Sequence, residues 1–238
     1  MNINEFLERG EDYYLPNLSI DLVIIGLHDE KLKCLLLQLG DKWLLPGGYI
    51  GQDESVENAV QRALVERTGL ETPHMKFLAV FGDKDRQFGD ELKNLSTKFG
   101  PSWRDGYWLN NRFVSLTYYS LVNFENSHPV ARGFDAYAWF CFDELPEMWM
   151  DLKSIALKAR NRLREDIKYE HVAFKLLPDQ FTMPELHHLH EVILEEKLDR
   201  SRFQKKMLSA GIFERLPKRL KESPGRNPYQ YSIKTHLF

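Results

Sequence analysis

The sequence predicts an α+β protein in which a strand-rich first part precedes a helical and basic second part. Three observations lead to this expectation. Apolar runs typical of strands recur as far as residue 142, and helical spacing of apolar residues begins at residue 152. A strongly basic segment then follows from residue 200. We expect three units: a domain over residues 1–150, a linker helix and connection over residues 151–175, and a second domain over residues 176–238.

The first unit is expected to begin with a β-hairpin. Residues 18–28 and 32–39 are apolar runs separated by a short polar turn. A loop containing Pro46 and two glycines follows. Residues 55–68 then carry apolar side chains at helical spacing, and Gly69 is suited to end this helix. Further strands are expected at residues 76–82, 112–122 and 136–142.

The sequence of the second unit predicts two helices that are joined by a short turn and followed by a hairpin. Thr182 and Glu185 have the spacing of a capping box at the start of the first helix. Asp199 is the expected N-cap of the second helix, which we expect to stop at Gly211. Two short strands around a basic loop are expected at residues 212–216 and 229–235. This order is typical of a winged helix-turn-helix.

The charge of the chain is unevenly distributed. Residues 200–234 contain ten Lys and Arg against two acids, a net charge of +8, although the whole chain carries −3. A solvated surface is the ordinary interpretation of a run of charges. This segment is also expected to be folded, so its excess of positive charge favours a polyanionic partner. The charge therefore predicts a nucleic-acid partner, and the winged helix-turn-helix order makes double-stranded DNA the expected one.

The composition indicates an ordinary globular protein, with 43% hydrophobic and 28% charged residues. We expect neither a membrane span nor a signal peptide, because apolar runs are short and the first residues are polar. Cys34 and Cys141 lie in strand-like runs, where buried reduced thiols are expected. The histidines at 187, 188 and 190 are expected on a surface helix rather than in a metal site. We expect a cytoplasmic protein.

The helix over residues 55–68 belongs to a motif that resembles the Nudix box. Its pattern is Gly48, Glu54, Arg62, Glu66 and Gly69, with the sequence Leu-Leu-Pro-Gly-Gly in front. Arg62 and Glu66 lie four residues apart, so an intrahelical ion pair that merely supports the loop is the alternative interpretation of this pair.

Nudix enzymes normally carry acids at the positions that match 63, 66 and 67, where they bind Mg²⁺. This chain has Ala63 and Arg67 at two of them. Because Arg67 places a positive charge where a cation would be held, we expect loss of the metal, no cofactor and no hydrolase activity. An active hydrolase with an accessory nucleic-acid-binding domain, using Glu54, Glu57 and Glu66, is the alternative.

Nearly the whole chain resembles the Nudix-related transcriptional regulators of bacteria, and residues 176–216 are the most specific part of this resemblance. The resemblance implies a Nudix-like α/β/α sandwich that senses a small molecule, followed by a winged helix-turn-helix that binds operator DNA. We predict a ligand-responsive repressor. We also predict a homodimer on a palindromic operator, because one winged helix covers only a few base pairs.

The resemblance leaves two effectors open: a sugar, with control of its catabolism, or ADP-ribose, with control of NAD metabolism. The sequence favours a pentose of the L-arabinose type. In the long polar loop over residues 83–111, cations alternate with acids that repel a diphosphate but accept hydrogen bonds from hydroxyls, and Trp103 and Trp108 could cover a sugar ring. For ADP-ribose, Arg67, Lys84 and Arg86 would neutralise the diphosphate. The predicted effector residues are Glu66, Arg67, Asp83, Lys84, Asp85, Arg86, Trp103, Arg104 and Trp108.

The helix that begins at Arg200 is the predicted recognition helix. Phe203, Met207 and Leu208 form its expected inward stripe. The first residues of such a helix reach base edges, so Arg202 is the first candidate for a guanine contact. Arg200 and Gln204 follow as candidates for base contacts. The residues expected to contact phosphates are Lys205, Lys206, Lys218, Arg219, Lys221 and Arg226.

Overall fold

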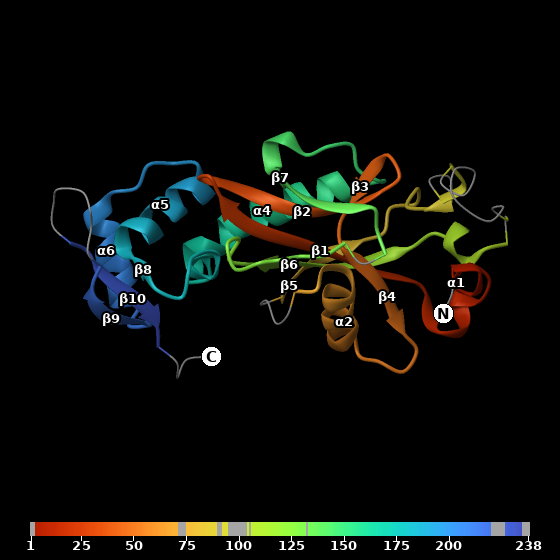
Figure 1. Ribbon diagram of the computed structural model, residues 1–238, viewed down its shortest axis with the longest axis horizontal. Helices are drawn as coiled ribbons and strands as arrows, with labels where there is room; N and C mark the ends of the chain where they lie inside the picture. The colour runs from red at the N-terminus through yellow and green to blue at the C-terminus, as the bar shows by residue number, and fades with distance from the viewer. Residues whose placement is uncertain are drawn as a thin grey trace.

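The computed structural model describes residues 3–70, 75–89, 92–94, 104, 106–131, 133–219 and 227–234. Within these ranges, a seven-stranded sheet with helices on both faces is followed by a smaller domain of two helices and a three-stranded sheet. Figure 1 shows this smaller domain at one end of the long axis and the N-terminal helix α1 (Ile3–Arg9) at the other. The expected α+β class and the order of the two domains are confirmed.

The large sheet is organised around the long strand β1 (Tyr14–His28). One part of β1 pairs antiparallel with β4 (Gly47–Gly51), and another pairs antiparallel with β2 (Lys31–Leu39). On its other side β1 pairs in parallel with β6 (Val114–Leu121). The remaining strands are β3 (Lys42–Leu44) and β7 (Ala136–Cys141), which pair with β2, and β5 (Met75–Phe81), which pairs with β6.

The two faces of β1 contact different helices because alternate side chains of a strand point to opposite sides. Ile20, Leu22 and Ile24 pack in one cluster with α2 (Val56–Thr68). Val23 and Ile25 pack in another cluster with α4 (Leu152–Tyr169). Because both faces are covered, β1 is a continuous apolar run over residues 22–25 rather than an alternating one.

The predicted elements of the first domain are present, but two strands, helix α1 and the 3₁₀ helices η1 (Gly10–Asp12) and η3 (Phe142–Glu144) were missed. Residues 47–51, expected as a loop, form strand β4, which pairs with β1, and the Tyr49 ring of β4 packs against Phe6 of α1. Strand β3 and helix α1 were not expected either. In its described part, the long segment 83–111 has one bridge, between Gln87 and Arg112, helical residues at 89 and 92–94, and the short helix η2 (Trp108–Asn110). These short elements carry weak local signals and depend on contacts with distant parts of the chain.

The small domain has the predicted winged helix-turn-helix order. Thr182 caps α5 (Met183–Leu194) through the expected capping box, since its Oγ1 accepts a hydrogen bond from the Glu185 amide at 3.3 Å. The Asp199 side chain caps α6 (Arg200–Ser209). The other elements are η4 (Ala173–Leu176), β8 (Phe181–Thr182), β9 (Phe213–Lys218) and β10 (Tyr229–Ile233), of which β8 was not predicted.

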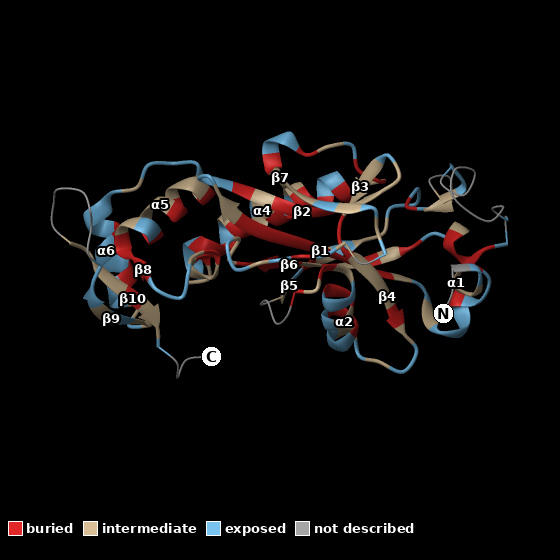
Figure 2. Ribbon diagram, viewed as in Figure 1, coloured by how far each residue is buried: buried red, intermediate tan, exposed pale blue. Residues whose placement is uncertain are grey.

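The two domains share one apolar core. Leu163 of α4, Leu189 of α5 and Phe203 of α6 belong to the same buried cluster as the sheet residue Leu36. Figure 2 shows buried residues running from the large sheet into the small domain. Helix α4, expected as part of a linker, packs on the sheet, and the boundaries at residues 150 and 175 stay a prediction.

No helix in the described part of the chain is long and apolar enough to span a membrane.

Candidate functional site

A cavity of about 640 Å³ lies between α1, β4, the end of α2 and the start of α4. Its volume falls in the range of small-molecule sites. The lining is mostly apolar and aromatic, with Tyr14, Tyr49 and Phe134 among its rings. Among the described residues, Asp21 and Arg67 are the charged ones that line it. A cavity of this composition can hold a ring system by stacking and a small number of polar groups by hydrogen bonds.

The Nudix-like box forms one wall of this cavity, and Arg62 holds its loop in place. The Arg62 Nε donates to Glu54 Oε2 at 3.0 Å, and Nη1 donates to Glu66 Oε2 at 2.9 Å. The Nη2 group donates to the Tyr49 carbonyl at 2.7 Å. The bond from Arg62 lowers the pKa of the Glu54 carboxyl below its ordinary value. The expected Arg62–Glu66 pair is therefore present, and it is part of a larger network that fixes the loop between β4 and α2.

The three positions where the Nudix pattern calls for acids present different groups. Ala63 is buried, and a Cβ atom on Gly48 would lie only 3.3 Å from its methyl group. Glu66 is half-exposed and paired with Arg62. Arg67 lines the cavity, donates from Nε to the Gly47 carbonyl at 3.2 Å and lies 5.3 Å from the centre of the Phe134 ring. A guanidinium thus faces the cavity where the pattern would place a carboxylate.

Beneath the cavity, Arg86 is buried between two carboxylates. Its Nη2 donates to Asp21 Oδ2 at 2.5 Å, and its Nε donates to Asp151 Oδ1 at 3.1 Å. The Arg86 side chain also reaches Ser19 Oγ at 3.3 Å, and Ser115 donates to Asp21. Burial raises the pKa of the Asp21 carboxyl above its ordinary value, and the positive charge of Arg86 opposes this shift. Arg86, a predicted effector residue, lies behind the cavity wall.

The other predicted effector residues are spread over several places. Asp83, Lys84 and Asp85 are exposed on the turn before Arg86 and do not line the cavity. Arg104 is exposed and pairs with Glu8 at 2.8 Å.

Trp108 is buried in an aromatic cluster, where its indole N–H donates to the Phe6 carbonyl at 2.9 Å. Trp103 lies outside the described residues. Of the nine predicted residues, the structure brings Arg67 to the cavity and places Arg86 directly behind it. Effector binding by all nine residues stays a prediction. The aromatic residues that line the cavity, such as Tyr49 and Phe134, were not predicted, because they come together from separate elements.

The recognition helix α6 buries Phe203 and Met207 and leaves its polar residues outside. Leu208, expected to face inward, is 41% exposed. This difference arises because α6 is covered by α5 along a narrow stripe. Lys206 is exposed, and its Nζ donates to the Lys168 carbonyl at the end of α4, 3.1 Å away. The other exposed residues of α6 that were predicted to contact DNA are Arg200, Arg202, Gln204 and Lys205.

The wing adds further cations next to this helix. Arg219 donates to Glu185 at 2.8 Å, so its charge is partly offset. Lys218 lies 5.2 Å from the centre of the Tyr229 ring. Arg215, which was not among the predicted contacts, lies over the same ring, 3.9 Å from its centre. Lys221 and Arg226 lie outside the described residues. DNA contacts by the individual residues stay predictions.

The fold, the cavity beside a Nudix-like box and the basic winged helix define a class of protein in which a Nudix domain is joined to a DNA-binding domain. Comparison with protein families agrees. The NUDIX domain family matches residues 19–160, and the NrtR DNA-binding winged helix domain matches residues 173–233. The chain belongs to the NUDIX family, and its second domain is similar to the DNA-binding winged helix of the NrtR transcriptional repressors.

Individual relatives are similar to this chain over almost its whole length. The ADPR responsive transcriptional repressor NtrR of Acinetobacter baylyi is 23% identical over 97% of this chain and 88% of its own. The structure of Shewanella oneidensis NrtR in complex with a 27mer DNA superposes with a TM-score of 0.72 at 27% identity, covering 91% of this chain and 93% of that one. A MutT/nudix family protein of Enterococcus faecalis has the same fold, with a TM-score of 0.69 at 22% identity, covering 98% of this chain and 94% of that one.

Proposed function

We propose that this protein is a transcriptional repressor that binds operator DNA through its winged helix and releases it when ADP-ribose occupies the cavity of the Nudix domain. One observation carries this proposal. A guanidinium, that of Arg67, faces an aromatic cavity in a chain that is similar over nearly its full length to an ADPR-responsive repressor.

The chemistry of the cavity supports a nucleoside diphosphate sugar. Guanidinium groups bind phosphate oxygens through paired, charge-assisted hydrogen bonds. The bond to Gly47 uses only Nε of Arg67, and a guanidinium has five N–H donors in total. Tyr14, Tyr49 and Phe134 supply ring faces for an adenine base, and the Asp21 carboxylate accepts hydrogen bonds from ribose hydroxyls. The cavity therefore offers a partner for each part of ADP-ribose.

The pentose that the sequence favoured is not supported. That choice depended on acids and tryptophans in the loop over residues 83–111. Asp83 and Asp85 are exposed away from the cavity, and Trp108 is buried against Phe6. The comparisons also favour ADP-ribose over a sugar. ADP-ribose, the alternative at the level of the sequence, therefore replaces the pentose.

The arrangement of the box supports binding without hydrolysis. Nudix chemistry needs Mg²⁺, a hard cation held mainly by carboxylates and water. Glu54 and Glu66 are both paired with Arg62, and Arg67 places a positive charge beside the remaining position. These groups do not fit Mg²⁺. We therefore propose that the domain binds ADP-ribose and leaves it intact, in preference to the alternative of an active hydrolase that uses Glu54, Glu57 and Glu66.

We further propose that the protein binds its operator as a homodimer. The recognition helix is short, with ten residues, and one such helix covers only a few base pairs. Two copies related by a two-fold axis would contact half-sites about one helical turn apart. Light scattering coupled to gel filtration should show a dimer at micromolar concentration, and a monomer with full operator affinity would contradict this part of the proposal.

The test is a titration of labelled DNA, taken from upstream of the protein's own coding sequence, at physiological salt. We expect specific binding that ADP-ribose weakens in the presence of EDTA, and that L-arabinose leaves unchanged. Chromatography of the recovered nucleotide, incubated with protein and Mg²⁺, should show intact ADP-ribose. Absence of specific DNA binding would overturn the proposal. Release of AMP, abolished by Glu66→Gln, would favour the hydrolase alternative.

A further inference from the structure

We propose that helix α4 couples the effector cavity to the recognition helix, with Asp151 as the positioning residue at its N-terminus and Arg164 as the positioning residue near its C-terminus. This inference rests on the proposed function and concerns how the two sites communicate. Helix α4 has 18 residues, so it spans about 27 Å. It begins at the cavity, and its last turns contact both helices of the helix-turn-helix.

The N-terminal end of α4 is part of the wall of the cavity. Leu152, the first residue of the helix, and Trp149, which precedes it, both line the cavity. Asp151 at the N-cap position accepts the hydrogen bond from Arg86, which is bonded in turn to Asp21 of the cavity wall. A ligand in the cavity therefore contacts the start of α4 directly and reaches it a second time through Arg86.

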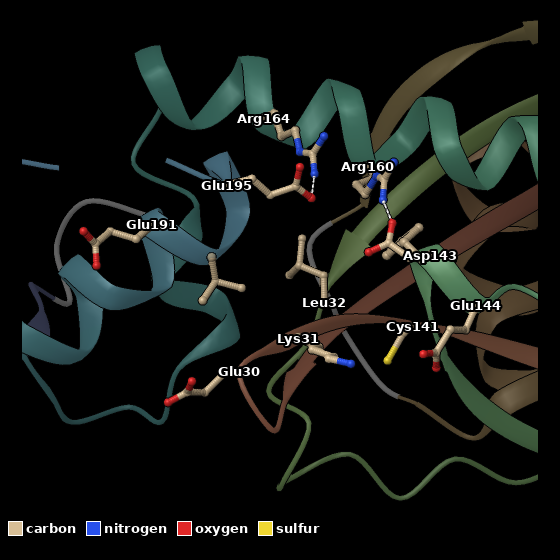
Figure 3. A pocket seen from close by; sticks show the side chains of 12 residues that line it. Glu30, Lys31, Leu32, Cys141, Asp143, Glu144, Arg160, Arg164, Glu191 and Glu195 are labelled. Atoms are coloured by element: carbon tan, nitrogen blue, oxygen red, sulfur yellow. Dashed lines mark hydrogen bonds and ion pairs between the residues drawn. The ribbon is translucent and has the colours of Figure 1, made fainter. Parts of the chain in front are cut away.

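The other end of α4 is bonded to the DNA-binding domain. Figure 3 shows Arg160 and Arg164 on adjacent turns of α4, beside a smaller cavity of about 320 Å³ between the two domains. Arg164 donates from Nε to the Ile193 carbonyl at the end of α5, 2.9 Å away, and pairs with Glu195. Lys206 of α6 donates to the Lys168 carbonyl in the last turn of α4. Helix α4 is thus bonded to both helices that position the recognition surface.

The packing of α4 favours movement as one body. Ile155, Ala156, Ala159 and Leu163 are fully buried against the sheet, and interiors packed at this density shift between discrete arrangements rather than deform gradually. A displacement at the N-terminus is then transmitted to the residues bonded near the C-terminus. Shear of a packed helix by a small distance is a known form of such a transition.

The charge of the ligand supplies a cause for this displacement. Arg86 balances two carboxylates, those of Asp21 and Asp151. A diphosphate bound at Arg67 brings further negative charge into the cavity, and its attraction draws the buried Arg86 guanidinium toward the cavity and away from Asp151. Weakening of the Arg86–Asp151 bond loosens the start of α4, and the arrangement of α5 and α6 bound to its other end changes with it.

The test compares Asp151→Asn and Arg164→Gln with wild type in the full-length protein. Anisotropy of the labelled operator gives the dissociation constant with and without ADP-ribose, and the ratio of the two is the coupling factor. We expect each variant to lower this coupling factor by about fivefold or more. Coupling factors between allosteric sites are typically about 5-fold to 150-fold, so a loss of this size can be measured. Calorimetry should show that both variants still bind ADP-ribose, and circular dichroism should show cooperative unfolding.

Arg160→Gln and Lys153→Gln are the matched controls. Arg160 lies one turn from Arg164 but pairs with Asp143 of its own domain, and Lys153 lies in the first turn of α4 but bonds to the Leu145 carbonyl. We expect both controls to keep the coupling factor of wild type. Should Arg164→Gln unfold, Arg164→Lys, which keeps the charge but loses the paired geometry, gives the same comparison.

Three results would count against the inference. Coupling equal to wild type in both Asp151→Asn and Arg164→Gln would exclude α4 as the connection. Equal loss of coupling in Arg160→Gln and Arg164→Gln would assign the effect to general damage to the helix, and this too contradicts a specific link. If ADP-ribose has no effect on operator binding by wild type, the proposed function itself fails, a result that is distinct from the other two.

Discussion

The Arg67 guanidinium lies 5.3 Å from the centre of the Phe134 ring, on the wall of the effector cavity. The ring face and the Gly47 carbonyl hold a positive charge at a position where the Nudix pattern has a metal-binding acid. The same scaffold that would hold a cation to reach a diphosphate here presents a cation of its own. Under the proposed function, Arg67 acts together with Ala63 to remove the metal, and the Arg67 guanidinium itself binds the anion.

The first prediction concerns this charge. Arg67→Glu should lower the affinity for ADP-ribose in EDTA by about tenfold or more, because a charge-assisted contact with phosphate is lost and a repulsive one is added. Arg67→Lys should lose less, since it keeps the charge but not the paired donors. Isothermal titration calorimetry measures both.

Gln61→Glu, on the exposed side of the same helix, is the control and should bind as wild type does. Unchanged affinity in Arg67→Glu would show that the diphosphate is bound elsewhere. A gain of affinity on addition of Mg²⁺ to wild type would show that the metal still takes part.

The second prediction concerns the hydrogen bonds by which Glu54 holds the loop of the Nudix-like box. Glu54→Gln should lower the free energy of unfolding at pH 7 by about 1–2 kcal/mol, because Glu54 accepts hydrogen bonds from Arg62 and from the Gly51 amide. The folded state lowers the pKa of Glu54, so this stabilisation is present above the ordinary Glu pKa of about 4.3 and is lost as the pH falls through the lowered value.

Urea denaturation of wild type and Glu54→Gln between pH 7 and pH 3 checks this sign. The difference in unfolding free energy should be constant near neutral pH and should shrink in the acid range. A difference that grows as the pH falls would contradict the lowered pKa.

Local patterns predicted the fold well, and long-range partners explain what they missed. The capping box of Thr182 and Glu185 depends on residues three apart, and Gly69 ends α2 with a positive φ of 70°. Arg86 could not be placed in the same way. Its partners Asp21 and Asp151 lie 65 residues away on either side, and only the folded sheet brings them together. The sequence identified Arg86 as a candidate cation near the effector. Its burial between two carboxylates could not be predicted, because that burial depends on tertiary structure.

The third prediction concerns His190 at the junction of α5 and α6. Burial lowers the pKa of His190 to about 4, and its Nδ1 lies 2.8 Å from the Leu186 carbonyl. The folded protein therefore binds a proton on this side chain less readily than the unfolded chain, whose ordinary His pKa is about 6.5. Stability from the neutral His190 is fully present above this value and is lost as the pH falls from about 6.5 toward 4.

His190→Leu removes the titrating group, so its unfolding free energy should vary less between pH 7 and pH 5 than that of wild type. His188→Leu, half-exposed on the same helix, is the control and should follow wild type. Equal pH dependence in wild type and His190→Leu would show that His190 is accessible to protons in the folded state.

The last prediction separates the residues that read the operator from those that only hold it. Arg202 and Lys205 are both exposed on α6, near its start and its middle. The early residues of a recognition helix reach base edges, whereas a lysine further along contacts phosphates. Arg202→Ala should therefore weaken binding to the operator by about 1–3 kcal/mol and change affinity for random DNA little. Lys205→Ala should weaken binding to both duplexes to a similar degree and reduce the dependence of log affinity on log salt by about one.

Anisotropy titrations of both duplexes at several salt concentrations distinguish the two effects. Neither alanine should disturb the helix, because Asp199 caps α6 through the backbone amide of Arg202 and not through the Arg202 side chain. An equal loss on operator and random DNA in Arg202→Ala would assign Arg202 to the phosphate backbone, and base reading would then have to come from Arg200 or Gln204.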